Sequence, residues 1–476
     1  MVLNLQKFYQ ACNPSKTLVV SNPADRQYYI DFASVRGGKI IEELKQNITF
    51  FSPDEPTCDL FTGHIGCGKS TELLRLKAEL EDAGFHVVYF ESSQDLEMGD
   101  IDIADVMLAI ARRVSESLSE LEKIELSEPK GFKSLLQGIA QILPKEVEVS
   151  AEASIPGIAK VSTGPNGQFS AEASIPGIGE IKADRKEGVS LIALGIGKIT
   201  AKAKNSPELR SRLREYLAPR TKSILDAINE ELIEPAIEKL KQRGKKGLVV
   251  IIDNLDRVES VQKAWGRLQA EYLFVDRGEQ LRQLKCHVVY TMPLALRFSN
   301  DVTRLTQRFA VNPKVLPMVP VMQRKGSICE EGMYLLKQMV MVRAFPFLTP
   351  EQRLDAVTEV FDTHETVERL CRVSGGHVRE LLMLLYDWIK KQRQLPLTRD
   401  VLEQVIKSRY NQMSLAITDD EWELLRQVAK NKQVRGDNGY RSLVHSRFVY
   451  EYCDNEGFWF DINPLLTEAP EFRSNG

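Results

Sequence analysis

The stretch LFTGHIGCGKST, residues 60–71, combines residue types that can hold a polyphosphate. The eight residues from Gly63 to Ser70 fit the spacing G-x-x-x-x-G-K-[ST] at every fixed position. Glycines let the backbone pass close to phosphates, and the helix that follows adds its positive N-terminal end. Lys69 would neutralise the β and γ oxygens, and the Ser70 hydroxyl would ligate Mg²⁺. The expected cofactor contacts are Gly63, His64, Ile65, Gly66, Cys67, Gly68, Lys69, Ser70 and Thr71.

The flanks of this stretch have the pattern that a phosphate loop needs. Residues 58–62 form a short, mostly apolar run of strand character, and residues 72–83 carry leucines at helical spacing. Strand, glycine loop and helix together favour binding of ATP with Mg²⁺ over the competing interpretation, an accidental glycine-rich turn. Cys67 lies beside the helix N-terminus, where a thiol pKa tends to be lowered, so we expect it to react with alkylating agents unless nucleotide protects it. The alternative is that Cys67 is a small filler.

A second acidic signal lies in GLVVIIDNLDRV, residues 247–258. Its apolar residues 248–252 predict a central parallel strand, and Asp253 at the tip would face the phosphate loop and hold Mg²⁺. Many hydrolytic ATPases place Glu after such an Asp to orient the attacking water, whereas this chain has Asn254. Either Asp256 takes over part of that role or turnover is slow. In the competing interpretation Asp256 belongs to a surface turn.

Polar residues after the next strand extend the expected site. Residues 287–290 (HVVY) predict a buried strand, and Thr291 at its end has the position of a polar residue that senses the γ-phosphate. The helical stretch beyond it carries Arg297, Arg304 and Arg308, any of which could reach the nucleotide of a neighbouring subunit. We expect ATP to drive self-association, with Arg304 or Arg308 acting across the subunit boundary. The alternative is that they are solvated surface charges.

The remaining elements supply the sheet and its cover. Residues 85–92 predict a buried strand, residues 103–121 an amphipathic helix with an acidic entry, and residues 315–321 the last of five strands. A helix is expected at about residues 39–49. Before it, an aromatic cluster either contacts adenine or only fixes the leader to the core, and we favour the second interpretation; its members are Tyr28, Tyr29 and Phe32, followed by Arg36.

An insertion interrupts the two halves of the nucleotide-binding pattern. The nine residues SAEASIPGI occur at 150–158 and again at 170–178, with turn chemistry (GPNGQ) at 164–168 between them. Alternating apolar and polar residues around a glycine turn favour a β-hairpin or small β stalk. Such a protrusion would contact a partner or a second copy, and a disordered tether is the alternative.

The order of these pieces resembles the AAA+ and STAND branch of P-loop ATPases over roughly residues 40–476 outside the insertion, and the string DNLDR is similar to the KAP group. Residues 327–410 read as four helices of a lid, one of which opens with SGGHVRELLMLL, residues 374–385. In origin-recognition and STAND-like ATPases a similar string begins the helix with the sensor-2 arginine. The resemblance therefore implies that Arg379 contacts the γ-phosphate; the alternative is a surface arginine.

The C-terminal residues 415–476 follow the order helix, strand, wing and strand of a winged helix. Such modules bind DNA or pack on the nucleotide domain as a regulatory lid. We expect the regulatory role because acidic residues surround the predicted wing and would repel a phosphate backbone; they are Glu451, Asp454, Glu456 and Asp461.

Composition excludes several other classes. Hydrophobic residues make up 43% of the chain, and 63 Lys plus Arg balance 66 Asp plus Glu, so no overall charge indicates nucleic acid or membrane. The seven cysteines form no C-x-x-C pair, which favours a reducing compartment. No apolar stretch reaches the roughly 20 residues of a membrane span, and the N-terminus lacks a signal-peptide pattern. We expect a cytoplasmic protein.

Together these patterns predict an α/β P-loop NTPase fold with a parallel sheet core, a helical lid, a C-terminal winged helix and a β-rich insertion. The expected function is an ATP-binding and ATP-hydrolysing molecular switch that acts in a multiprotein assembly with protein partners that the sequence does not name. The alternative is an ATP-driven DNA loader or remodeller related to origin-recognition ATPases. The expected divisions are a leader (1–50), the ATPase core (51–125 and 206–325), the insertion (126–205), the lid (326–414) and the winged helix (415–476).

Overall fold

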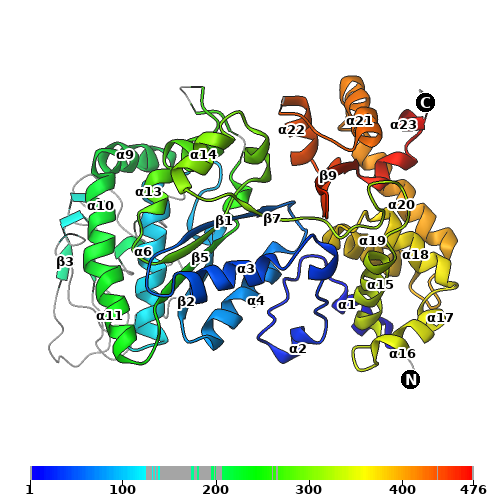
Figure 1. Cartoon of the computed structure of the whole chain (residues 1–476), viewed down its shortest axis with the longest axis horizontal. Coiled ribbons are helices and arrows are strands. Elements are labelled where there is room, and N and C mark those ends of the chain that lie inside the picture. The colour runs from blue at the N-terminus through cyan, green and yellow to red at the C-terminus, as the bar shows by residue number, and fades with distance from the viewer. Residues whose placement is uncertain are drawn as a thin grey trace.

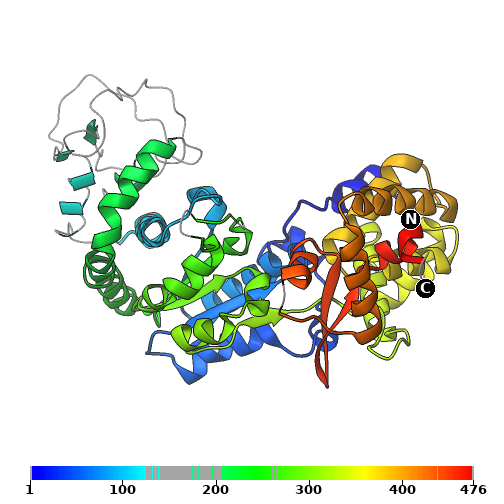
Figure 2. The ribbon, with the colours of Figure 1, turned by 90° about the horizontal axis from the view of Figure 1, so that it is seen from above.

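The computed structural model describes residues 3–124 and 206–473 except 260, 264, 265 and 437, together with 131, 134–135, 138–139, 173–175, 179–181, 195–197 and 199. A sheet covered by helices occupies one side of the molecule, and a helical lid with a small β-containing module occupies the other (Figure 1). Figure 2 gives the view from above, in which the first helices of the chain lie between the sheet and the lid.

The centre of the first part is a five-stranded parallel sheet in the order β2-β5-β6-β1-β7. This confirms the expected parallel α/β core. The last strand is shorter than expected, because Pro317 directly after it lacks the N–H that would continue the ladder. The strand bounds are β1 Cys58–Gly63, β2 His86–Glu91, β5 Leu248–Asp253, β6 His287–Thr291 and β7 Lys314–Leu316.

Alternation along the strands builds the two hydrophobic layers. In β5, Val249 and Ile251 pack in the cluster that contains the leucines of α4, whereas Val250 and Ile252 pack in the cluster of α6. Successive side chains of a strand point to opposite faces, so a continuous apolar run serves both layers. One face is covered by α3 Ile40–Gln46 and α4 Lys69–Asp82. The other is covered by α6 Ile103–Glu120, α9 Pro207–Leu217, α10 Thr221–Ile228, α11 Glu234–Gln242, α13 Gly278–Arg282 and α14 Val302–Phe309.

The lid is a separate helical cluster with its own core around Trp388 and Phe361. The N-terminal helix α1 Leu5–Ala11 joins this core through the buried Phe8, so this part of the expected leader packs with the lid. The lid helices are α15 Glu330–Ala344, α16 Pro350–Asp355, α17 Val357–Val360, α18 His364–Val373, α19 Val378–Gln392 and α20 Arg399–Ser414.

The C-terminal module is a winged helix, as the sequence predicts. Its wing is the antiparallel pair β8 Val449–Asp454 and β9 Gly457–Ile462. The helices that pack with it are α21 Asp419–Asn431 and α22 Asn438–His445. Contacts of α22 with the 3₁₀ turn Leu294–Phe298 dock the module on the nucleotide domain.

Within the expected insertion the structure describes an antiparallel pair, β3 Ala173–Ile175 with β4 Gly179–Ile181. The first copy of the repeat, most of the second and the GPNGQ turn lie outside the described residues. Among the described residues, no helix is both long and apolar enough to cross a bilayer.

Candidate nucleotide-binding site

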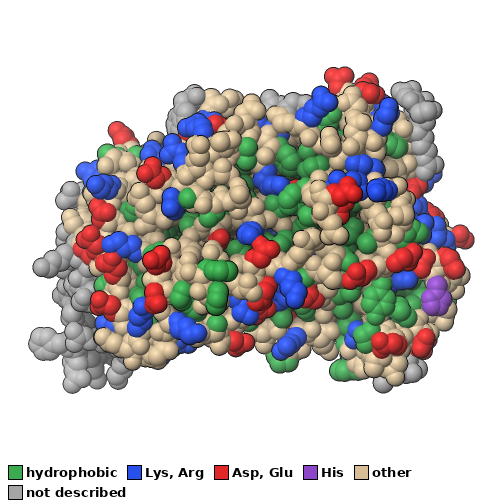
Figure 3. Space-filling model, viewed as in Figure 1, with side chains coloured by type: hydrophobic (Ala, Val, Ile, Leu, Met, Phe, Trp, Pro, Cys, Tyr) green, Lys and Arg blue, Asp and Glu red, His purple; other side chains and the backbone are tan. Residues whose placement is uncertain are grey.

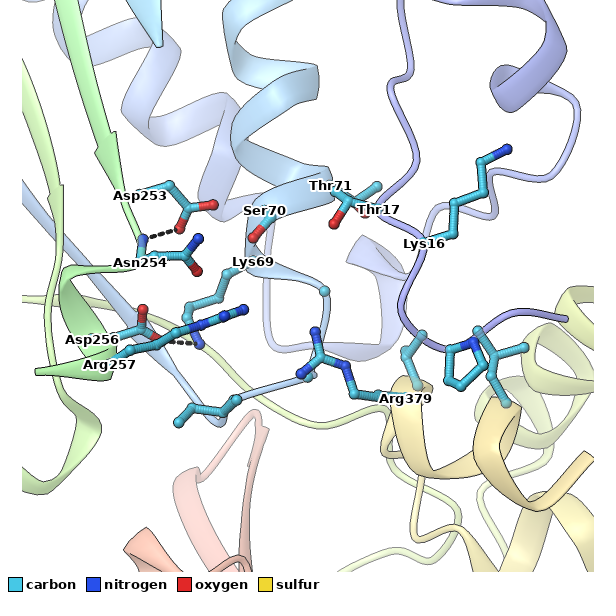
Figure 4. Close-up of a pocket in the computed structure, with 16 residues that line it drawn as sticks. Lys16, Thr17, Lys69, Ser70, Thr71, Asp253, Asn254, Asp256, Arg257 and Arg379 are labelled. Atoms are coloured by element: carbon cyan, nitrogen blue, oxygen red, sulfur yellow. Dashed lines mark hydrogen bonds and ion pairs between the residues drawn. The ribbon is translucent and has the colours of Figure 1, made fainter. Parts of the chain in front are cut away.

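A cavity that is open to solvent lies at the carboxyl edge of the sheet, between the phosphate loop (residues 63–71), the end of β5 and the lid helix α19. Figure 4 shows its polar lining, in which side chains from these three places converge. Ligands bind at this edge of open parallel sheets because the strand tips and helix N-termini meet there. The lining residues are Pro14, Lys16, Thr17, Ile65, Gly66, Gly68, Lys69, Ser70, Thr71, Asp253, Asn254, Asp256, Arg257, Val378, Arg379 and Leu382.

The glycines of the phosphate loop serve two different needs. A Cβ on Gly66 would approach the His377 ring carbon to 2.6 Å, so glycine is needed there because the lid packs directly on the loop. Gly68 has φ +106, and a Cβ on it would meet nothing within 4 Å. It caps the N-terminus of α4 and leaves the helix's first N–H groups open to the cavity. Of the expected loop contacts, Gly63, His64 and Cys67 do not line the cavity.

Lys69 is engaged by the protein itself. Its Nζ lies 2.8 Å from Asp256 Oδ2 and donates to the carbonyl oxygens of Gly63 at 2.8 Å and His64 at 2.9 Å. Burial opposes the ammonium charge, but the carboxylate of Asp256, first among its neighbours, holds the pKa of Lys69 above its usual value. The Lys69 and Asp256 side chains are each 5% exposed. A bound phosphate would therefore compete with Asp256 for this cation.

Asp253 is held at both carboxylate oxygens. Its Oδ1 accepts from its neighbour's backbone, the Asn254 N–H, at 2.7 Å, and its Oδ2 accepts from the Tyr89 hydroxyl at 2.8 Å. Tyr89 comes from the adjacent strand β2, and its hydroxyl also lies near that of Ser70. Burial and the charge of Asp253 raise the pKa of Tyr89, so the phenol stays a donor. Ser70 and Asp253 supply the hydroxyl and carboxylate oxygens that Mg²⁺ prefers, and this donor set fits the ion.

The backbone conformation explains why Asn rather than Glu follows Asp253. Asn254 adopts the left-handed conformation, with φ 63 and ψ 7. Among non-glycine residues, Asn and Asp tolerate this region best, whereas a Glu would be strained there. The turn that results brings Asp256 into the cavity. Its Oδ1 is buried and has no hydrogen-bond partner among the described residues, so it is free to accept from a water molecule.

Two arginines point into the same cavity from opposite walls (Figure 4). Arg379 comes from the first turn of the lid helix α19, as the sequence predicts, and Arg257 follows Asp256 at the end of β5. Sequence reasoning did not select Arg257. Its position in the string DNLDR, one residue beyond a candidate catalytic acid, is the signal that could have identified it.

Lid and winged helix both bond to the tip of the phosphate loop. His377 Nδ1 caps α19 by accepting from the Glu380 N–H at 2.9 Å, so Nε2 carries the proton and donates to the Ile65 carbonyl at 2.9 Å. From the wing, the Glu451 N–H donates to His64 Nε2 at 3.0 Å. Burial lowers the pKa of both histidines, that of His377 to about 4, so both rings are neutral at pH 7.

The N-terminal segment forms a further wall that sequence reasoning missed. Pro14, Lys16 and Thr17 line the cavity beside the lid residues Val378 and Leu382. No local pattern marks these residues, because their place depends on α1 packing into the lid. The aromatic cluster that follows does not line the cavity: the Tyr29 hydroxyl bonds to Glu72 at 3.0 Å, and Arg36 lies by Phe32 and donates to the Cys67 carbonyl.

Other expected site residues lie outside the cavity. Thr291 is buried behind it, where its hydroxyl accepts from the Leu255 N–H at 2.9 Å and fixes the turn that carries Asp256. Arg304 and Arg308 lie on α14 and pair with carboxylates of their own chain, Asp276, Asp301 and Glu279. Arg297 pairs with Glu451 inside the molecule, so it is not available to a neighbouring subunit.

Two expectations need correction. Cys67 is fully buried, with its sulfur 3.7 Å from the Leu316 carbonyl oxygen, so it is a packed filler rather than an accessible thiol. Three of the four acids around the wing each have a cation of the chain as partner, whereas Glu456 is 64% exposed and only shares Arg324 with Asp454. Glu451 is buried against Arg297, Asp454 pairs with Arg324, and Asp461 pairs with Lys432.

Comparisons with known proteins give a likeness in outline. No protein-family model matches the sequence, and no curated protein matches it. The structure is similar to the Walker-type ATPase of Pyrococcus abyssi (10% identity, TM-score 0.41, 97% of this chain and 99% of that chain). It is also similar to two Aeropyrum pernix proteins: ORC2 in its ADPNP–ADP complexes (11%, TM-score 0.36, 91% and 91%) and ORC1 in complex with DNA (11%, TM-score 0.33, 91% and 93%). These TM-scores are below 0.5, so the assignment to the P-loop NTPase fold rests on this chain's own strand order, phosphate loop, lid and winged helix.

Proposed function

We propose that this protein binds Mg-ATP in the cavity, hydrolyses it slowly, and uses the nucleotide state as a switch within a multiprotein assembly. The observation that carries the proposal is the convergence on one cavity of a glycine loop at a helix N-terminus, Lys69, Ser70 and a doubly held Asp253. The lid adds Arg379 from the opposite wall. This arrangement suits a triphosphate, which needs backbone N–H groups, cations and a metal site together.

In this proposal the hydrolytic roles are divided among the chain's own residues. Lys69 and Arg379 neutralise phosphate oxygens, and Ser70 with Asp253 would hold Mg²⁺, which when bound would offset negative charge on the nucleotide. Asp256 orients water through Oδ1, which has no hydrogen-bond partner among the described residues. The oxygen of the water bonds to the γ-phosphorus while the bond to the β–γ bridging oxygen breaks, giving ADP, inorganic phosphate and a proton. The ion pair between Asp256 and Lys69 supports slow turnover, because a bound nucleotide must first break this ion pair.

The switch role is supported by where lid and wing touch the loop. His377 bonds to Ile65, the Arg379 N–H donates to the Gly66 carbonyl at 3.2 Å, and the Glu451 N–H donates to His64. A phosphate that reshapes residues 64–66 would alter contacts to both modules at once. We keep ATP-driven self-association in the proposal, since the exposed α14 could meet a second copy.

Lys69→Ala tests the nucleotide site. Calorimetric titration with Mg-ATP should show at least tenfold weaker binding, because losing a phosphate-bound charge costs well over roughly 1 kcal/mol. The substitution also strands Asp256, so the Lys69→Ala/Asp256→Asn double variant is the matched control for folding. Binding within about threefold of the parent in both variants would refute the assignment. Faster hydrogen exchange in β8 on binding would support the switch, and identical exchange with and without nucleotide would count against it.

The DNA-loader alternative has one observation in its favour: three of the four wing acids are each paired with a cation of the chain. Against it, positive and negative side chains are interspersed on the face in Figure 3, without a basic stripe of the kind that tracks a phosphate backbone. Salt-dependent DNA affinity, or turnover stimulated by DNA, would favour the loader over the switch.

A further inference from the structure

The lining of the cavity carries more positive than negative charge. Four of its side chains are cationic and two are carboxylates. Lys69 is paired with Asp256. Lys16 is paired with Asp25 at 2.5 Å, and Asp25 does not line the cavity. The cations that remain are Arg257 and Arg379. Within the part of the chain that the structure describes, neither guanidinium has an ion pair or a hydrogen-bond acceptor.

The charge of Arg257 acts on Arg379. Burial and then the charge of Arg257 lower the pKa of Arg379, with Arg447 of the winged helix contributing next. Like charges that share a partly desolvated cavity repel, and an anion placed between them removes that repulsion. In Figure 4 both guanidinium groups project into the space above the phosphate loop. A group with several negative oxygens fits this space.

We propose that Arg257 binds the terminal phosphate of ATP from within the same chain, opposite Arg379; this rests on the proposed function. Asp256 and Arg257 are consecutive residues of the 3₁₀ turn Leu255–Arg257, so one turn presents a water-orienting acid and a charge-stabilising cation. The turn follows β5 directly, and the Leu255 N–H bond to Thr291 fixes it. Arg257 is exposed, so it can adjust to a phosphate without a cost in core packing.

This role differs from that expected of Arg304 and Arg308. Those residues do not line the cavity of their own chain, and their carboxylate partners lie beside them. A role for them in hydrolysis would require the nucleotide of a neighbouring subunit, and hydrolysis would then depend on assembly. Arg257 already lines the cavity, so turnover per molecule should not depend on protein concentration.

The experiment compares Arg257→Ala and Arg257→Lys with Arg212→Ala, a control at an exposed arginine of α9 outside the cavity. Fluorescent-nucleotide displacement gives the affinities for Mg-ATP and Mg-ADP, and phosphate release gives turnover across a range of protein concentrations. In Arg257→Ala we expect turnover to fall roughly 10²–10³-fold and ATP to bind about tenfold more weakly, with ADP within about threefold. Lys at this position should restore part of the loss, and Arg212→Ala should match the parent.

Three outcomes would overturn the proposal. Parent-like turnover and an unchanged ratio of ATP to ADP affinity in Arg257→Ala would show that Arg257 does not reach the terminal phosphate. An equal loss of ATP and ADP binding would assign it to the inner phosphates. The third outcome is turnover per molecule that rises with protein concentration and is lost in Arg304→Ala or Arg308→Ala but not in Arg257→Ala. That result would assign the catalytic cation to a neighbouring subunit. Failure of the proposed function looks different, since the parent would then bind no nucleotide in a Lys69-dependent way.

Discussion

Replacing Asp256 by Asn should make nucleotide bind more tightly while hydrolysis slows. The Asp256 carboxylate neutralises Lys69 at 2.8 Å, in a place where each side chain is 5% exposed. The substitution Asp256→Asn would keep the shape of the side chain and remove its charge. Lys69 would then rely on the carbonyl oxygens of Gly63 and His64, which carry no formal charge.

The size of the change in affinity depends on whether the free or the nucleotide-bound protein loses the Lys69–Asp256 ion pair. Breaking a buried ion pair costs about 3–5 kcal/mol, because the remaining charge has no partner. The two carbonyl bonds and the nearby Asp253 offset part of that cost. In the bound state a phosphate would take the place of Asp256, so the cost falls on the free protein alone. A net gain of about 2 kcal/mol in binding corresponds to a dissociation constant roughly thirtyfold lower.

Calorimetric titration with ADP in EDTA isolates this effect from the metal. Asp253→Asn is the matched control, since it also removes a carboxylate from the lining, but one held by Tyr89 and the Asn254 N–H rather than by Lys69. Its affinity in EDTA should stay within about threefold of the parent, whereas its Mg-dependent turnover should be lost. Turnover of Asp256→Asn with Mg-ATP should fall about 10²–10⁴-fold, as expected when a group that orients water is neutralised.

Two results would refute this reasoning. An unchanged or higher dissociation constant for ADP in Asp256→Asn would mean that the ion pair does not compete with phosphate for Lys69. Parent-like hydrolysis in the same variant would remove Asp256 from the catalytic residues and leave it a structural partner of Lys69.

Three further predictions concern neighbouring parts of the site. Tyr89→Phe should raise the Mg²⁺ concentration needed for half-maximal turnover about tenfold, because Asp253 loses a positioning hydrogen bond. The control is Tyr452→Phe, which removes a buried hydrogen bond to the Gly375 carbonyl. An equal shift in both variants would indicate a general loosening of the fold rather than a change at Asp253. The thermal midpoint should fall as pH drops from about 6.5 toward 4, because the unfolded chain protonates histidine at its usual pKa of about 6.5 while folded His377, with a pKa of about 4, stays neutral; a pH profile of His377→Asn as steep as that of the parent would contradict this. Cys67 in the folded, nucleotide-free protein should react with iodoacetamide far more slowly than a model thiol, because it is fully buried; reaction at the model rate, with mass spectrometry locating the label on Cys67, would show that the loop opens.

Local patterns predicted the elements that carry the main binding groups. The G-x-x-x-x-G-K-[ST] spacing depends on backbone conformation within a few residues, and the apolar runs of β5 and β6 are long enough to identify buried parallel strands. The five-stranded sheet, the lid helices and the wing followed from the same periodicities, because strands and helices repeat their buried positions every two and every 3.6 residues. Arg379 was selected by the resemblance of residues 374–385 to origin-recognition and STAND-like ATPases.

Only the tertiary structure decided which side chains share the cavity. Pro14 and Lys16 reach it because α1 packs into the lid, and no pattern in the first 50 residues indicates that contact. Tyr89 holds Asp253 because β2 pairs with β5, strands separated by more than 150 residues. Glu451 is acidic in the sequence, yet its charge is buried against Arg297. Periodicity shows which face of an element is buried, but the partner on that face is fixed only when distant elements pack together.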